Sequence, residues 1–223
     1  MKYIIANWKM NMNFEDLTKW VAGFSELQAC VTPAVEVILA PSFVHIPAIF
    51  ELSQKTSLKL SSQDVSFEEK GAHTGETGAF QLKAFCKYAI IGHSERKEDQ
   101  KTMIKKRNAC LKEGITPIIC FVNPRGLKDL YSENCIFVWE DPKNISKNGV
   151  YNVKSTLEIE KTVGEIRKKL PSTSTLIYGG SVNETNIGEL SKIEKLDGVL
   201  VGNASLDPKT FADIISAYSK KFE

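Results

Sequence analysis

The chain has 223 residues, of which 42% are hydrophobic and 25% are charged, as in ordinary soluble globular proteins. Its 29 Lys and Arg residues exceed its 27 Asp and Glu residues by two, and this net charge of +2 argues against a general binder of nucleic acids or anionic membranes. No apolar run approaches the roughly 20 residues of a membrane-spanning helix, and residues 1–7 lack a signal-peptide pattern. We therefore expect a cytoplasmic protein whose partner is neither a membrane nor a nucleic acid.

Eight short segments are continuously apolar rather than alternating, which is typical of parallel strands that are covered on both faces. In chain order they are residues 3–8, 35–40, 58–64, 88–92, 116–121, 135–139, 175–179 and 198–202. Longer segments with apolar residues at three- and four-residue steps lie between them and predict covering helices. These helices are expected over residues 14–30, 97–113 and 154–170, and a last one is expected to begin at Asp207-Pro208.

The alternation of strand and helix predicts right-handed crossovers in either an open doubly wound sheet or a closed barrel. Eight units without a linker favour the barrel, so the expected fold is α/β, a single-domain (β/α)8 barrel over residues 1–223. Such barrels typically need about 250 residues. The shortfall is expected in the fifth unit, where only residues 125–132 could be helical.

The cysteines contain no Cys-x-x-Cys pair, which argues against a zinc site and against a disulfide framework. We expect reduced thiols in a cytoplasmic compartment. Cys30, Cys86 and Cys110 are expected to be buried as small apolar side chains.

Polar residues end three of the predicted strands, on the side where barrel enzymes carry their active sites. Asn7 and Lys9 end the first strand, and their spacing of two places both side chains on the same side. His93 and Glu95 follow the fourth strand, and Glu140 follows the apolar sixth strand, where a desolvated carboxylate could act as a base. Taken alone, each residue also has a non-catalytic interpretation, as a solvated lysine, a structural histidine or a loop acid.

Glycines follow the seventh and eighth strands, in Gly179-Gly180-Ser181 and Gly202-Asn203. Glycine lets a backbone approach a ligand closely, and N–H groups after these two strands commonly bind phosphate in such barrels. The two segments together indicate a phosphorylated ligand.

Five segments resemble, in the same order, motifs of the triosephosphate isomerase family. They are Asn-Trp-Lys-Met-Asn at 7–11, Gly-Ala-His-Thr-Gly-Glu at 71–76, Ile-Gly-His-Ser-Glu-Arg at 91–96, Tyr-Gly-Gly-Ser-Val at 178–182 and Gly-Asn-Ala-Ser-Leu at 202–206. The resemblance covers essentially the whole chain. It implies an isomerase of dihydroxyacetone phosphate and glyceraldehyde 3-phosphate that needs no metal and no organic cofactor.

The same resemblance implies a role for each matching residue. Glu140 would be the base, and His93 would be a neutral imidazole that polarises the substrate carbonyl, its charged form disfavoured by a helix beginning just after it. Lys9 would stabilise the enediolate and the phosphate, and Asn7 would hold a substrate oxygen. Glu95 resembles a buried acid that contacts the lysine.

Further residues match the family's supporting positions. Ser94 resembles the serine that holds the base in an empty site, and the backbone amides of Ser181, Gly202 and Asn203 would bind phosphate. The loop that carries Thr74 and Glu76 would reach a second subunit, with Arg96 available to pair with the acid. These matches imply a homodimer. The alternative is that residues 71–76 form a solvated glycine-rich loop that contacts no second subunit.

The chain departs from the family after Glu140. The family's Pro is displaced by one position, its lid Trp is missing and the end of its lid differs, which affects the expected exclusion of water more than proton transfer. Counting without a gap places Ser146 on a phosphate-binding glycine, so Ser146 is a candidate phosphate contact. Lys97 stands where the family has a second Arg, and Asn203 replaces a second glycine.

Two other functions remain open. A non-catalytic phosphate-binding barrel or interaction scaffold would account for the altered lid and the short fifth unit. A different phosphosugar enzyme of the Schiff-base type would need a lysine within a barrel strand. The nearest candidate is Lys59, which lies at the start of a predicted strand.

Overall fold

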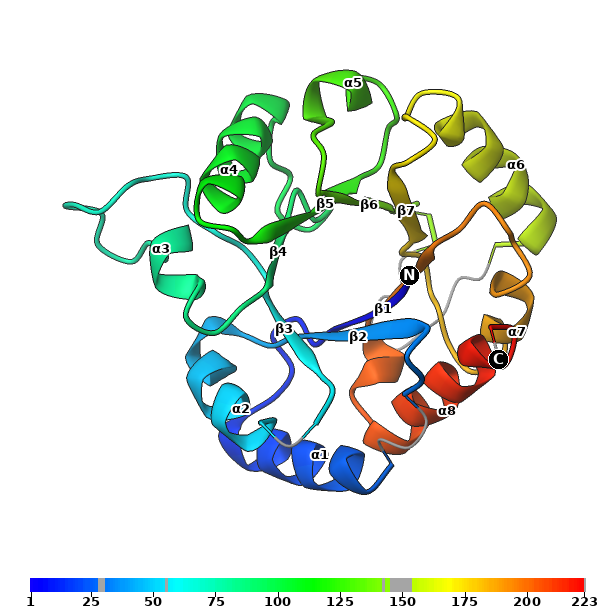
Figure 1. The fold of residues 1–223 in the computed structure, drawn as a ribbon, viewed down its shortest axis with the longest axis horizontal. Helices are drawn as coiled ribbons and strands as arrows, with labels where there is room; N and C mark the ends of the chain where they lie inside the picture. Colours follow the sequence, from blue (N-terminus) through cyan, green and yellow to red (C-terminus); the bar gives the residue numbers. More distant parts are fainter. Residues whose placement is uncertain (28–30, 55, 142, 145–153, 223) are drawn as a thin grey trace.

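The computed structural model describes residues 1–27, 31–54, 56–141, 143–144 and 154–222. Within these residues eight parallel strands pair in chain order and close into a barrel, as Figure 1 shows looking down the ring. The strands are β1 (Lys2–Asn7), β2 (Val35–Ala40), β3 (Lys59–Ser62), β4 (Tyr88–Ile91), β5 (Thr116–Phe121), β6 (Ile136–Trp139), β7 (Thr175–Tyr178) and β8 (Gly198–Val201). The predicted (β/α)8 barrel is confirmed.

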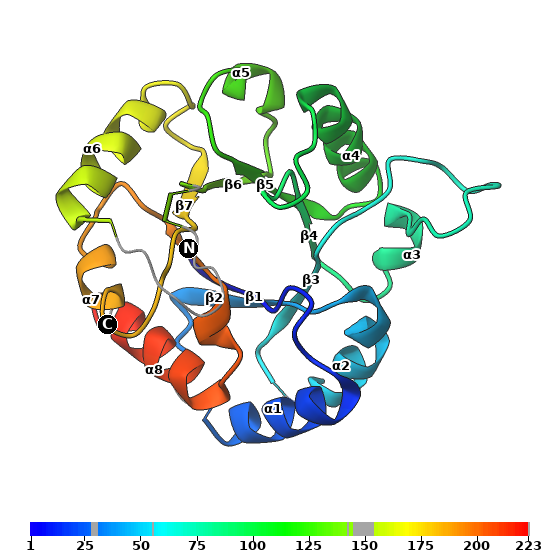
Figure 2. The same cartoon turned by 180° about the vertical axis from the view of Figure 1, so that it is seen from behind.

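The helices surround this ring in both views (Figures 1 and 2). They are α1 (Phe14–Leu27), α2 (Ile46–Leu52), α3 (Ala79–Leu82), α4 (Gln100–Lys112), α5 (Leu127–Leu130), α6 (Thr156–Arg167), α7 (Ile187–Leu190) and α8 (Pro208–Ser219), with short 3-10 turns η2 (Phe43–His45) and η3 (Asn203–Ser205). The loop between β3 and α3 projects from the ring.

Helix caps explain where the predicted helix boundaries were wrong. The helix expected from residue 97 begins at Gln100, because the Asp99 side chain accepts a hydrogen bond from the Thr102 amide. The helix expected over residues 154–170 is α6, which is shorter and is capped by Ser155. Asp207 caps α8 as predicted, since its carboxylate accepts from the Thr210 amide at 2.7 Å.

The barrel has an inner and an outer apolar layer, because side chains alternate along each strand. The inner layer consists of Ile5, Ile38, Ala40, Tyr88, Ile90, Ile118, Cys120, Ile136, Val138, Ile177 and Leu200. This layer fills the barrel, so the interior is closed to a ligand. The polar side chains that end the strands therefore lie at its mouth.

The fifth unit is short, as predicted, and side chains of α4 form hydrogen bonds with its backbone. Its only helix among the described residues, α5, has four residues and buries Leu127 and Leu130. Gln100 donates to the Gly126 carbonyl at 3.1 Å, and Arg107 donates to the carbonyls of Asp129 and Tyr131 at 2.8 and 3.1 Å. Side chains from α4 thus satisfy backbone groups that a longer fifth helix would have satisfied itself.

The cysteines that the structure describes are free and buried: Cys86, Cys110, Cys120 and Cys135. Burial raises the pKa of Cys86 to about 12, so its thiol is protonated at neutral pH. Cys30 lies outside the described residues. The helices described are too short or too polar to cross a bilayer, and the same residues contain no cluster of three or more potential metal-binding side chains.

Candidate active site

The strand ends bring distant polar residues to one cavity at the barrel mouth. The cavity is lined by Lys9, His93, Glu140, Gly179, Ser181, Val182, Leu200, Gly202 and Asn203. Lys9 follows β1, His93 follows β4 and Glu140 follows β6, so three separate units contribute one ionisable group each. Asn7 is buried at the end of β1.

A glycine turns His93 into this mouth. Strand alternation places Ile90 in the inner layer and Ile91 in the outer layer, so His93 would point outward if β4 simply continued. Gly92 interrupts the alternation with a φ of 72°, in the left-handed region. A Cβ at this position would lie 2.7 Å from the Cys120 carbonyl oxygen, so both the conformation and the space require glycine.

His93 and Glu140 form the most buried polar contact of the site. Their Nε2 and Oε1 atoms lie 3.2 Å apart, and the residues are 5% and 2% exposed. The Glu95 amide donates to His93 Nδ1 at 3.3 Å. Nδ1 is therefore the acceptor of a neutral ring, and Nε2 carries the proton that faces Glu140. The other Glu140 oxygen accepts from the Ser94 amide at 2.9 Å.

Burial shifts the pKa of each partner toward its neutral form. It raises the pKa of Glu140 to about 7, against the opposing effects of the Ser94 amide hydrogen bond and the Lys9 charge. Burial, assisted by the Lys9 charge, lowers the pKa of His93 to about 4. At neutral pH the imidazole is uncharged and Glu140 is poised to take or give a proton.

The predicted reason for the neutral histidine was wrong. A helix directly after His93 was expected to disfavour its charged form, but α4 begins only at Gln100. Residues 94–96 form a turn instead, closed by a hydrogen bond from the Arg96 amide to the His93 carbonyl at 2.8 Å. Burial and the nearby lysine produce the shift.

Lys9 has a strained backbone that neighbouring side chains hold in place. Its φ is 52°, which is uncommon for a residue with a Cβ. Its amide donates to Asn7 Oδ1 at 3.0 Å, and its carbonyl accepts from Gln63 Nε2 at 2.9 Å and from Ser42 Oγ at 3.1 Å. The Lys9 ammonium lies 2.7 Å from Glu95 Oε1, as predicted.

Glu95 differs from its prediction in one respect. A buried acid was expected, but 55% of the Glu95 side chain is exposed in this chain. The contact with Lys9 is present and the burial is not. Glu95 stands in the turn over residues 94–96, where the single chain leaves Glu95 and Arg96 exposed.

The proposed phosphate side of the cavity is built from the ends of β7 and β8. Ser181 has a φ of 45°, and its carbonyl accepts from the side chains of Asn183 and Asn186 at 3.1 and 3.0 Å. Gly202 precedes η3 and accepts from Ser205 Oγ at 2.7 Å. Both turns are therefore held by side chains from the residues that follow them.

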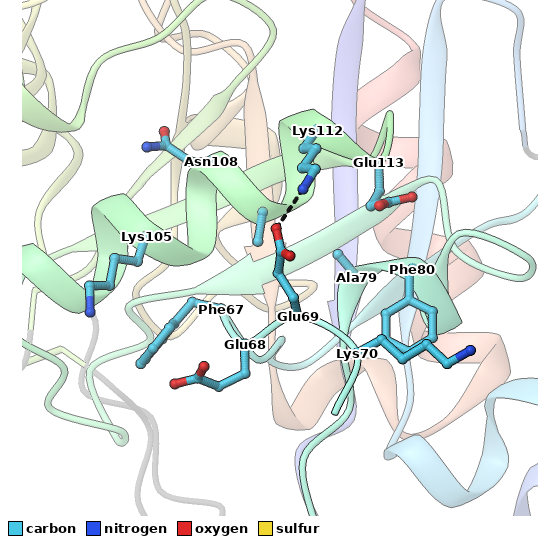
Figure 3. Close-up of a pocket in the computed structure, with 11 residues that line it drawn as sticks. Phe67, Glu68, Glu69, Lys70, Ala79, Phe80, Lys105, Asn108, Lys112 and Glu113 are labelled. Carbon is cyan, nitrogen blue, oxygen red and sulfur yellow. Dashed lines mark hydrogen bonds and ion pairs between the residues drawn. The ribbon is translucent and has the colours of Figure 1, made fainter. Parts of the chain in front are cut away.

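A second, larger hollow lies outside the barrel (Figure 3). It has a volume of about 710 Å³ and lies between residues 67–70, the start of α3, and the outer face of α4. Lys112 and Glu69, which both line it, form a 2.6 Å ion pair with each other. No buried base or histidine lines it, so it does not compete with the barrel mouth as the catalytic site.

The sequence profile of the Triosephosphate isomerase family matches residues 2–130 and 126–218 of this chain. The chain belongs to the triosephosphate isomerase family. The two matched segments meet in α5, at the shortened fifth unit.

Individual family members match over nearly their full length. Triosephosphate isomerase of Dehalococcoides mccartyi is 34% identical over 95% of this chain and 94% of its own length. The proteins of the same name from Thermodesulfovibrio yellowstonii and Mycoplasmopsis pulmonis are 32% and 31% identical, covering 96% of this chain and 98% and 96% of their own lengths.

The loop predicted to meet a second subunit projects from the barrel (Figure 1). Thr74 and Glu76 are exposed on it. Arg96, the expected partner for such an acid, pairs within its own chain with Asp64, at 2.6 Å between Nη2 and Oδ2. About half of the Arg96 side chain stays exposed.

Ser146, predicted as a candidate phosphate contact in the altered lid, lies outside the described residues. Gln63 was not predicted, although its side chain ties the Lys9 carbonyl to the end of β2. The sequence signal was weak, because β3 reads Lys-Leu-Ser-Ser and so has no apolar run whose end a polar residue could mark.

Proposed function

We propose that this chain is a triosephosphate isomerase that interconverts dihydroxyacetone phosphate and D-glyceraldehyde 3-phosphate. The observation that supports this most strongly is the buried pair of Glu140 and neutral His93, which shares one cavity with Lys9. A scaffold that only bound phosphate would gain nothing from a desolvated carboxylate, because burial destabilises its charged form.

In this proposal Glu140 removes a proton from C1 of the bound ketose. Its pKa of about 7 makes it a stronger base than a hydrated carboxylate. The His93 Nε2–H donates to the C2 oxygen while the enediolate forms, and the Lys9 charge stabilises the developing oxyanion. Returning the proton to C2, with a proton exchanged between the two oxygens through His93, gives the aldose.

The remaining groups bind and support the substrate. The backbone amides of Ser181, Gly202 and Asn203 hold the phosphate together with Lys9, and Asn7 holds both Lys9 and a substrate oxygen. Glu95 pairs with the Lys9 ammonium at 2.7 Å. The Ser94 amide keeps Glu140 beside His93 until substrate arrives.

The test is a dye-coupled assay of the purified protein with each triose phosphate, run with and without a metal chelator. We expect rapid interconversion in both directions and no effect of the chelator. Binding of the triose phosphates without turnover would support the scaffold alternative instead. Methylglyoxal formed during turnover would report loss of the intermediate through the altered lid.

The pH dependence of kcat/KM is expected to follow Glu140. Activity should rise with pH and level off above about 7, because only the carboxylate accepts the proton. His93 stays neutral well below this range, so it adds no second limb above pH 5. Binding of glycerol 3-phosphate, measured over the same pH range, corrects for ionisation of the substrate phosphate. A kcat/KM that stays flat down to pH 5 would contradict the assignment of Glu140.

We further propose a cytoplasmic homodimer whose sites are completed at the interface, with the loop carrying Thr74 and Glu76 reaching the other subunit. Exposed apolar residues support this: Met10, next to Lys9, is 94% exposed, and Val44, two residues after the Ser42 that donates to the Lys9 carbonyl, is 80% exposed. A second subunit there would also cover Glu95.

Sedimentation velocity at assay concentration should give about twice the chain mass of 24.9 kDa. Met10→Asp should shift the protein to monomer and lower kcat. Leu157→Asp is the matched control, because Leu157 is also an exposed apolar residue, on α6. A wild-type protein that is entirely monomeric yet fully active would reject the shared site.

A further inference from the structure

One lysine contacts the residues on both sides of the proposed base. Lys154 lies just before α6, and its ammonium is 2.8 Å from Asp141 Oδ2. The same ammonium is 5.5 Å from the centroid of the Trp139 ring. Since Trp139 and Asp141 flank Glu140 in the chain, Lys154 links the two neighbours of the proposed base.

The contacts of Lys154 with Asp141 and Trp139 are partly buried and supported by further contacts. The side chains of Lys154 and Asp141 are 21% and 14% exposed, so solvent screens their attraction less than that of a surface pair. Trp139 also packs against Tyr178 of β7, with ring centroids 5.4 Å apart, and is thus held between a ring and a cation. Asp141 Oδ1 accepts in addition from the Lys143 amide at 3.1 Å.

Glu140 needs such support because it lies past the end of its strand. Its amide donates to the Phe121 carbonyl at 2.9 Å, and its carboxylate is held by Ser94 and His93. A base must lie within hydrogen-bond reach of the proton that it removes, and a displacement of about 1 Å can lower a rate about a hundredfold.

We infer that Lys154 and Asp141 are positioning residues that fix the backbone on both sides of Glu140 and so set where its carboxylate lies. This inference rests on the proposed isomerase function. It predicts an effect on kcat rather than on KM, because the base acts in the transition state while the phosphate is bound from β7 and β8.

The test compares variants in the isomerase assay. Lys154→Met should lower kcat about tenfold and leave KM within about twofold of wild type. Asp141→Asn should do the same, and the double variant should be no slower than the single ones, because both remove one interaction. Lys154→Arg should keep most of the activity, since guanidinium retains the charge and stacks on aromatic rings.

Lys2→Met is the matched control. Lys2 has the same 21% side-chain exposure, an aspartate partner at 3.4 Å and an aromatic ring at 5.4 Å, but it lies at the start of β1, away from the mouth. We expect its kcat to be unchanged. Thermal unfolding of every variant is measured alongside.

The inference is overturned if Lys154→Met and Asp141→Asn each keep kcat within twofold of wild type, or if the losses multiply in the double variant. It is also overturned if Lys2→Met lowers kcat equally, which would indicate a general loss of stability. An inactive wild-type protein would instead refute the proposed function itself.

Discussion

Glu140→Gln is expected to lower kcat about a thousandfold while KM changes only a few-fold. Glutamine keeps the shape of the side chain and can still accept from the Ser94 amide, but it cannot take a proton. Removing a general base typically costs between about a hundredfold and ten-thousandfold in rate. Tight binding of a phosphate-bearing enediolate mimic by the inactive variant would show that the site is intact.

The same substitution should make the protein more stable at pH 8. The pKa of Glu140 is raised in the folded protein from its ordinary value of 4.5 to about 7. Folding therefore favours the protonated form, and stability is lost as the pH rises from about 4.5 through 7. This loss amounts to at most about 3 kcal/mol above pH 7, and the neutral amide should avoid it.

Two measurements check these expectations. Turnover in the coupled assay and urea unfolding at pH 5 and pH 8 are compared for Glu140→Gln and for Glu160→Gln, an exposed change on α6. The control should match wild type in both. Full activity of Glu140→Gln would mean that another group is the base, with Asp141 the nearest candidate. If the difference in unfolding free energy between Glu140→Gln and wild type is the same at pH 5 and pH 8, the raised pKa is contradicted.

The sequence predicted most of this barrel because its strands are defined by local patterns. Continuous apolar runs such as residues 116–121 became β5 with the same bounds, since a strand covered on both faces has no polar positions to blur its ends. Helix ends were predicted less well. A cap such as Asp99 depends on one side-chain hydrogen bond, which apolar periodicity does not reveal.

The site shows a similar division. Polar residues that end apolar strands identified Lys9, His93 and Glu140, and the structure brings them to one cavity. The reason for the neutral histidine was not predictable, because it depends on burial by residues distant in sequence. The burial of Glu95 was expected from its resemblance to a family position rather than from a local pattern, and in the single chain its side chain is 55% exposed.

Removing the charge of the buried Lys106 is expected to destabilise the fold. The Lys106 ammonium is buried between two carboxylates, at 2.6 Å from Asp64 Oδ1 and in a short contact with Glu98 Oε1. Lys106→Met leaves both acids buried beside the half-exposed Arg96, which lies 2.6 Å from Asp64 and 3.6 Å from Glu98. Breaking such a buried cluster from one side costs about 3–5 kcal/mol, or roughly 10 °C in melting temperature for a chain of this size.

The loss of Lys106 should also affect the proposed active site, because the Glu98 carboxylate accepts a hydrogen bond from the Gly92 amide. The accepting atom is Glu98 Oε2, at 2.8 Å, and Gly92 is the residue that directs His93 into the mouth. Without Lys106 the buried Glu98 carboxylate loses its partner cation and is expected to move toward water. This movement would break its hydrogen bond with the Gly92 amide. We therefore expect kcat to fall together with stability, in contrast to a change at Lys154.

Lys105→Met separates this effect from a general loss of charge on α4. Lys105 is the exposed neighbour of Lys106, and its ammonium lies 4.5 Å from the Phe67 ring. Its removal should cost less than about 1 kcal/mol and leave kcat unchanged. A Lys106→Met protein that unfolds at the wild-type temperature would show that the two acids find water or each other without penalty. One that loses stability but keeps full kcat would show that the hold of Glu98 on Gly92 does not depend on the lysine.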